Sequence, residues 1–125
     1  MGLLNRAQLL TKEELKKEKV VLDEAQDEYV FVRQMTAHEK SIWEMSQVKQ
    51  SGKGKGVSYD VTLDDYRAKL AVVCICDEEG ELLFKPNDYL ELSMNISASK
   101  LEKIVDVAQR LNAITEEDRE EIVKN

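Results

Sequence analysis

The chain of 125 residues is 42% hydrophobic, which excludes a disordered chain and predicts a single domain, residues 1–125, with its own core. Its net charge of −7 disfavours nucleic acid and anionic membranes as partners, because both repel a negative protein. No run approaches the roughly 18 apolar residues of a membrane span, and the N-terminus lacks signal-peptide features, so we expect a cytoplasmic protein.

Helix starts are indicated by a pattern in which a hydroxyl residue stands three positions before a carboxylate. In such a capping box the hydroxyl accepts from a backbone amide of the first turn, and the carboxylate reaches back to the cap amide. The pattern occurs at Thr11 and Glu14, Thr36 and Glu39, Thr62 and Asp65, Ser99 and Glu102, and Thr115 and Asp118. It predicts about five helices.

Two short runs rich in β-branched and aromatic residues, Val20–Leu22 and Tyr29–Val32, flank a polar stretch at 23–28. They predict an antiparallel hairpin in which Tyr29 and Phe31 share one face. A lone hairpin is marginal in water, so we expect it to pack on the helices. The predicted fold class is therefore α+β, with one N-terminal β-hairpin packed on a mainly helical domain of about four to five helices.

The spacing of apolar residues supports several of these helices. The helix after Thr36 is expected to end near Gln50, and the helix after Thr62 continues through "LAVVCIC" towards Gly80, a residue suited to ending it. A short extended piece at Leu82–Phe84 follows, and Pro86 suits the start of a short helix. The clearest apolar stripe comprises Leu101, Ile104, Val105, Ala108 and Leu111.

Three of the five glycines lie in "SGKGKGVS", residues 51–58, where they alternate with Lys53 and Lys55. A phosphate loop of the Walker type needs G-x-x-x-x-G-K-[ST] after a strand, and here neither lysine precedes a serine or threonine. Glycine punctuation of this kind is typical of loops. The stretch therefore predicts a mobile surface loop without nucleotide affinity, and a loop that becomes ordered on a partner is the functional alternative.

Few residues suggest catalysis. The only histidine, His38, falls in the polar first turn after Thr36 and is expected to face solvent. Cys74 and Cys76 lie in an apolar run and are expected in the core, and no second cysteine pair completes a zinc site. The carboxylates stand in runs typical of solvated faces. We therefore predict no catalytic, metal-binding or cofactor-binding residues and a protein that is not an enzyme.

The large apolar residues Met35, Trp43, Met45 and Met94 are the candidates for contact with a partner. Methionine adapts to irregular surfaces and is frequent at adaptable binding sites. Ordinary core packing is the alternative for all four, because large apolar residues are mostly buried. The chain is therefore interpreted as an acidic, helix-rich binding module.

Three stretches, taken in order, resemble the tail assembly chaperones of long-tailed bacteriophages, the siphovirus class. "YVFVRQMTAHEKSIWE" (29–44) resembles a strand that carries V-R-x-[ML]-T-[AG]-x-E into a helix. "DYRAKLAVVCICDEEGELLF" (65–84) resembles an arginine-bearing helix closed by D-E-[DE]-G. "LEKIVDVAQRLNAITEEDREEIVKN" (101–125) resembles a helix that ends in L-N-x-[LI]-T, followed by an acidic last helix.

The resemblance implies a chaperone that binds the tape measure protein and keeps it soluble until tail tube subunits polymerise around it. It also implies action in the cytoplasm of the bacterial host, absence from the mature virion, a possible homo-oligomer, and in some relatives a longer frameshifted form. The family has no catalytic residues to transfer to this sequence, and the glycine–lysine loop departs from its plainer loop.

Two other functions stay open from the residues alone. One is a small acidic regulatory protein that inhibits an enzyme by occupying its basic site. The other is a small thiol enzyme, which requires Cys74 or Cys76 to be exposed with a lowered pKa.

Overall fold

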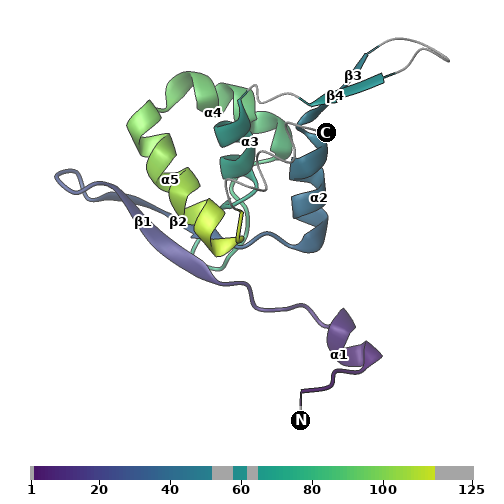
Figure 1. Ribbon diagram of the computed structural model, residues 1–125. Coiled ribbons are helices and arrows are strands. Elements are labelled where there is room, and N and C mark those ends of the chain that lie inside the picture. The colour runs from purple at the N-terminus through teal and green to yellow at the C-terminus, as the bar shows by residue number, and fades with distance from the viewer. Residues whose placement is uncertain (1, 52–57, 62–64, 115–125) are drawn as a thin grey trace.

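A computed structural model describes residues 2–51, 58–61 and 65–114. It confirms the α+β fold class, with a hairpin against a mainly helical body (Figure 1). The elements are α1 (Arg6–Leu10), β1 (Lys17–Asp23), β2 (Glu28–Arg33), α2 (Ala37–Met45), β3 (Val48–Ser51), β4 (Ser58–Val61), α3 (Tyr66–Val72), β5 (Ile75–Cys76), the 3-10 helix η2 (Pro86–Asp88), α4 (Tyr89–Asn95) and α5 (Ala98–Leu111). Figure 1 shows α3 at the centre of the helices, between α5 and α2.

The predicted hairpin is confirmed as the antiparallel pair β1 and β2, in which Val20 lies opposite Val30. Its inner face is apolar, since Val20 and Val32 are buried. On its other face the rings of Tyr29 and Phe31 meet edge to face, with centroids 5.8 Å apart. The hairpin packs against α5, as expected of an element that is marginal alone.

A third strand corrects the prediction of a long helix through "LAVVCIC". The helix α3 ends at Val72, and β5 pairs with β2 so that the sheet order is β1-β2-β5. β-branched residues favour extended backbone, and β2 has a free edge that offers ladder hydrogen bonds. Gly80, at φ +87°, therefore lies in a turn after β5 instead of ending a helix. The carboxylate of Asp77 accepts from the amides of Glu79 and Glu81 in this turn.

The helix α2 begins as predicted, with the Thr36 hydroxyl accepting from the Glu39 amide and the Glu39 carboxylate accepting from the Thr36 amide. It ends at Met45, earlier than the expected end near Gln50. The chain continues into β3, which pairs with β4 in a second hairpin that the sequence interpretation missed. The predicted loop 51–58 thus begins and ends in strand residues, and its residues 52–57, with both lysines, lie outside the described residues.

Two other predicted helix starts, at Thr11 and Ser99, are wrong, because the helices in these regions begin after other residues. The first helix begins after Asn5, whose side chain forms a capping box with Gln8, and Thr11 ends that helix instead of starting one. The helix α5 begins after Ser97, which caps the Lys100 amide, two residues before the predicted Ser99. For α3, Asp65 is the cap residue itself and makes no side-chain cap bond, while Thr62 and the whole start at Thr115 lie outside the described residues.

The core lies between the sheet and the helices α2, α3 and α5. The predicted stripe of α5 is confirmed, since Leu101, Ile104, Val105 and Ala108 are buried and Leu111 packs partly buried against them. The short helix predicted at Pro86 is also confirmed, as η2 running into α4. Of the predicted extended piece, Leu82 forms a bridge with Cys76.

A charged pair joins the end of β2 to the first turn of α2. Arg33 is 7% exposed, and two of its guanidinium nitrogens each donate to one carboxylate oxygen of Glu39 at 2.8 Å. A further bond runs from Arg33 to the carbonyl of Gln34. Such bidentate pairs are strong and directional. This pair therefore ties the first turn of α2 to the end of β2.

Stability is expected to fall in acid because of this pair. Hydrogen bonding and the charge of Arg33 lower the pKa of Glu39. The pKa of Glu39 is lower in the folded protein than the value of about 4.3 in the unfolded chain, so the pair stabilises the fold fully above that pH. This stabilisation is lost as the pH falls through the pKa of the folded protein. Denaturant titrations of the parent and of Glu39→Gln at several pH values measure this. We expect the parent to be the more stable at pH 7 and the difference to shrink below about pH 4.3; a constant difference down to the acid limit contradicts the prediction.

Candidate functional site: apolar surfaces

The four candidate partner residues are divided between core and surface. Met35 and Trp43 are buried, with 8% and 2% of their areas exposed. Met45 and Met94 are 64% and 77% exposed, although both are large apolar residues. A partner can therefore reach Met45 and Met94 directly, whereas Met35 belongs to the core. The role of all four in partner binding stays a prediction.

An apolar groove of about 210 Å³ lies between α2, α3 and the start of η2 and α4. Its lining comprises Ile42, Trp43, Ser46, Lys69, Val73, Pro86, Asn87 and Tyr89. Trp43 packs against Tyr66 of α3, with ring centroids 5.7 Å apart. The indole N–H of Trp43 is buried and has no hydrogen-bond partner among the described residues. Trp43 is thus a core residue that also forms part of the groove wall.

Lys69 orders one side of this groove. Its ammonium donates to the Ser46 carbonyl at 2.8 Å, near the C-terminal end of α2. It also lies 5.2 Å from the centre of the Tyr89 ring, which is within cation–π range. One side chain of α3 therefore holds the end of α2 and the start of α4 around the groove.

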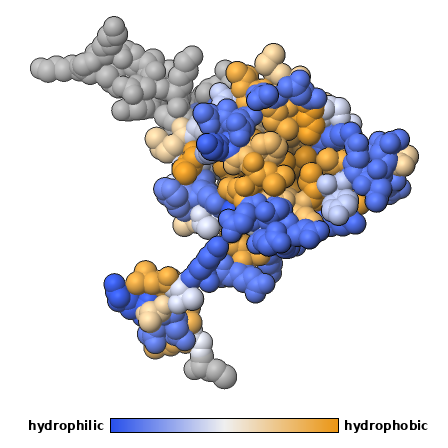
Figure 2. Space-filling model, turned by 180° about the vertical axis from the view of Figure 1, so that it is seen from behind, coloured by the Kyte–Doolittle hydropathy of each residue, from blue (hydrophilic) through white to orange (hydrophobic). Residues whose placement is uncertain are grey.

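Exposed apolar side chains also lie on the helices. Met45 stands three residues after Ile42, a spacing that places neighbours on one side of a helix, so it continues the groove along α2. On α4, Leu90 and Met94 are exposed and four residues apart, which forms a second apolar stripe. The sequence interpretation missed Leu90, which its spacing from Met94 could have indicated. Figure 2 shows apolar surface of the body surrounded by polar surface.

The N-terminal arm, residues 2–16, carries a separate apolar cluster. Its four leucines at positions 3, 4, 9 and 10 are all more than half exposed, and no residue of α1 is buried. Figures 1 and 2 show α1 held away from the body on an extended connection. The sequence interpretation missed the arm as a candidate site, although the repeated Leu-Leu pair in "GLLNRAQLL" is a visible signal.

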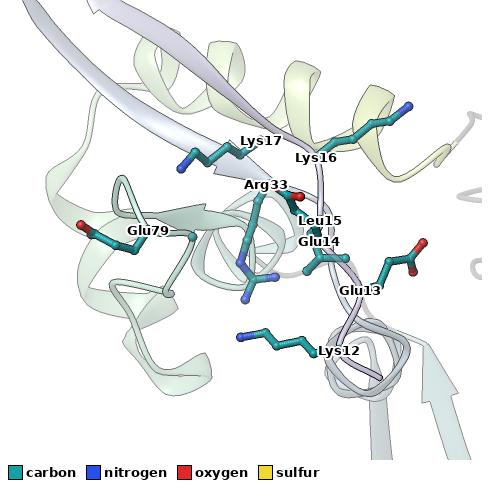
Figure 3. Close-up of a pocket in the computed structure, with 9 residues that line it drawn as sticks. Lys12, Glu13, Glu14, Leu15, Lys16, Lys17, Arg33 and Glu79 are labelled. Atoms are coloured by element: carbon teal, nitrogen blue, oxygen red, sulfur yellow. The ribbon is translucent and has the colours of Figure 1, made fainter. Parts of the chain in front are cut away.

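A more polar cleft of about 710 Å³ separates the arm from the body (Figure 3). In Figure 3 the side chains of Arg33 and Lys12 extend into the same space, while that of Glu13 points away from it. The guanidinium of Arg33 is already bonded to Glu39, and its Nε has no partner among the described residues. Residues 12–17 line one side of the cleft, and Arg33, Glu79 and Gly80 line the other.

The thiols do not meet the condition for a thiol enzyme. Both cysteines are free and buried, which confirms their predicted place in the core, and burial raises the pKa of Cys74 to about 12. Burial also raises the pKa of Cys76. A reactive cysteine needs the opposite shift and access to solvent, so this alternative is wrong. His38 is exposed, as predicted.

Within residues 2–51, 58–61 and 65–114, no cluster of three or more histidine, cysteine or carboxylate side chains is arranged to hold a metal ion. In the same part of the chain, every helix is too short or too polar to cross a bilayer.

No protein-family model matches the chain, and no curated protein matches it. Among solved structures, the chain is similar to the tail assembly chaperone of bacteriophage HK97, with a TM-score of 0.46 and 11% sequence identity. The similarity covers 74% of this chain and 84% of the HK97 chain.

Proposed function

We propose that the protein is a phage tail assembly chaperone that binds the tape measure protein and keeps it soluble until the tail tube polymerises around it. The ordered resemblance of the stretches 29–44, 65–84 and 101–125 supports this family. The observation that carries the mechanism is the set of exposed apolar side chains on the helices α2 and α4 of an acidic protein.

These surfaces suit a chaperone for a long apolar helical chain. Exposed apolar stripes such as Leu90 with Met94 offer area to an apolar helix face, and contiguous exposed apolar area usually marks interaction sites. Methionine side chains adjust to different partner shapes, which suits successive stretches of one client. The net charge of −7 keeps the loaded chaperone soluble, because like-charged complexes repel each other.

The proposal includes where and with what the protein acts. It works in the cytoplasm of the bacterial host, meets tail tube subunits when they displace it from the tape measure protein, and is absent from the finished virion. It acts by binding alone and uses no cofactor.

Co-expression with the tape measure protein tests the proposal. We expect the parent to raise the soluble yield of that protein and the double variant Met45→Ser, Met94→Ser to lose most of the gain. The matched control is Glu44→Ser, Glu91→Ser, which changes exposed polar residues on the same two helices and is expected to retain the gain. All four positions are exposed, so these substitutions should change stability by no more than about 0.5 kcal/mol.

Equal soluble yields with and without the chain contradict the chaperone proposal. Co-purification with a host or phage enzyme through a basic site, in place of the tape measure protein, would instead favour the inhibitory alternative.

A further inference from the structure

The outer face of the first hairpin combines basic and aromatic side chains. It comprises Lys17, Lys19 and Val21 of β1 with Tyr29 and Phe31 of β2, which alternate with the residues of the inner face. Lys19 lies opposite Phe31, and Val21 lies opposite Tyr29. Val21 is 42% exposed and Tyr29 41%, and both lysines are exposed. The outer face therefore presents positive charge and apolar area together.

The two rings of this face hold the lysine ammonium groups in place. The ammonium nitrogen of Lys19 lies 4.1 Å from the centre of the Tyr29 ring. That of Lys17 lies 5.5 Å from the centre of the Phe31 ring, so both are within cation–π range. Contact with a ring restricts a side chain that is otherwise flexible. The face therefore offers two charges in positions that are partly fixed before a partner binds, which lowers the entropy cost of binding.

The glutamates of the same two strands are paired on the side of α5. Glu18 forms an ion pair with Arg110, and Glu28 forms one with Lys100 at 2.8 Å. The net charge of −7 thus belongs to the whole chain and does not describe the outer face, where the lysines supply local positive charge. Because salt screens exposed charges beyond about 8–10 Å, a partner on this face interacts mainly with these lysines.

Carboxylates stand beyond both ends of the outer face and limit where an acidic partner can bind. At the Lys17 end, Glu13, Glu14 and Glu79 line the cleft beside the arm, among three other basic side chains. At the other end, the turn at 23–28 contains four acidic side chains and no basic one. A partner's carboxylates are therefore favoured over the two lysines and disfavoured near the turn.

The spacing along the strand indicates what kind of partner fits. Residues two apart on a strand are separated by about 7 Å, and an extended peptide has the same repeat. Carboxylates two positions apart on such a peptide can therefore meet Lys17 and Lys19 together. The next side chain on that side of the peptide then reaches the apolar area of Val21 and Tyr29, just before the acidic turn.

We propose that the outer face of the first hairpin binds an extended segment of another protein with the pattern acidic-x-acidic-x-apolar. The lysines pair with the two carboxylates, and Val21 with Tyr29 contacts the apolar residue. This surface is separate from the exposed apolar residues of α2 and α4, so the inference goes beyond the proposed function and does not depend on it.

Single-stranded nucleic acid is the other partner that aromatic and basic residues on strands suggest. Base stacking needs a free ring face, and here an ammonium group already lies over each ring. A nucleic acid also carries a charge at every nucleotide, so its length would meet the acidic turn and a chain of net charge −7. A short segment with two carboxylates meets less repulsion, so the observations favour the peptide.

Fluorescence anisotropy with short labelled peptides and the full-length protein tests the proposal. The probe carries Glu-Thr-Glu-Thr-Val between uncharged serine and glycine residues. One control peptide has Gln-Thr-Gln-Thr-Val, which removes the charges, and another has Glu-Glu-Thr-Thr-Val, which changes only their spacing. We expect the probe to bind at low salt and to bind more weakly as salt rises. Both control peptides are expected to bind at least about threefold more weakly.

Variants of the outer face locate the binding. Lys17→Gln and Lys19→Gln are each expected to weaken probe binding about two- to fivefold, the size of an exposed ion pair. The matched control Lys40→Gln removes the same charge from an exposed position on α2 and is expected to bind like the parent. Tyr29→Leu keeps both lysines and removes the ring that positions Lys19, so it should also weaken binding. Thermal melting checks that each variant is folded.

Carbodiimide coupling supplies a second readout, because it joins a carboxylate to a lysine amine as an amide with loss of water. We expect mass spectrometry to find the probe mainly on Lys17 and Lys19. The proposal is overturned by absence of binding at low salt, by equal binding of the peptide with altered spacing, by an equal loss in Lys40→Gln, or by coupling spread evenly over all lysines. Tighter binding of a labelled oligothymidylate than of the probe overturns it in favour of nucleic acid.

Discussion

Replacement of Trp43 by alanine is expected to lower the free energy of unfolding by about 3–5 kcal/mol. Trp43 is 2% exposed and is among the largest fully buried side chains of the described residues. Its ring contacts Tyr66, which joins α2 to α3, and the substitution leaves a cavity between these helices. Because the indole N–H has no partner among the described residues, the loss is one of packing and not of a hydrogen bond.

Equilibrium denaturation followed by far-UV dichroism measures this loss. Trp43 is the only tryptophan, so fluorescence can follow the parent but not the variant. The control is Met45→Ala on the same helix, which is 64% exposed and should change the free energy by no more than about 0.5 kcal/mol. Equal stability of the two variants would show that Trp43 is a surface residue and that the groove is wider than described.

Local sequence signals predicted the parts of the fold that depend on neighbouring residues. The capping box at Thr36 is formed by residues three positions apart, and the first hairpin is formed by runs that a short turn connects. The α5 stripe depends only on helical periodicity. In each case the residues that decide the structure lie within one or two turns of each other, so no knowledge of the rest of the chain is needed.

Long-range pairing explains the main errors. The strand β5 exists because β2 presents an open edge to a segment more than 40 positions away, and the apolar run at 70–76 suits a helix and a buried strand equally. The start at Thr11 failed because the residues after it lack an apolar stripe, whereas Asn5 and Gln8 form the same box with amide side chains. The strands β3 and β4 have only four residues each, too few for a clear alternation.

The sequence indicated candidate residues for partner contact by their type, but it did not indicate which of them are exposed. Residue type indicated methionine and tryptophan, but the sequence could not separate the buried Met35 from the exposed Met94, because burial depends on how helices pack. The sequence interpretation also missed Leu90, although it stands four residues before Met94, a spacing that places the two side chains on one side of α4. The groove joins side chains from α2, α3 and η2, and no local pattern brings those three elements together.

Arg33→Met is expected to lower the free energy of unfolding by about as much as Trp43→Ala does, for a different reason. The substitution leaves the Glu39 carboxylate, whose side chain is 19% exposed, without its bidentate partner. Breaking a buried pair from one side costs about 3–5 kcal/mol, because the remaining charge loses its ionic partner and is only partly solvated. Glu39→Leu should cost a similar amount, since it leaves Arg33 unpaired and also removes an acceptor from the Thr36 amide.

The double variant Arg33→Met, Glu39→Leu separates charge from packing. Exchange of a whole buried pair for apolar residues is often neutral, so we expect the double variant to be more stable than the sum of the two single losses predicts. Denaturant titration of all four proteins gives the coupling free energy, and Lys40→Ala, an exposed change on α2, controls for altered helix propensity. Additive losses would show that the two side chains act independently and that the pair does not orient α2.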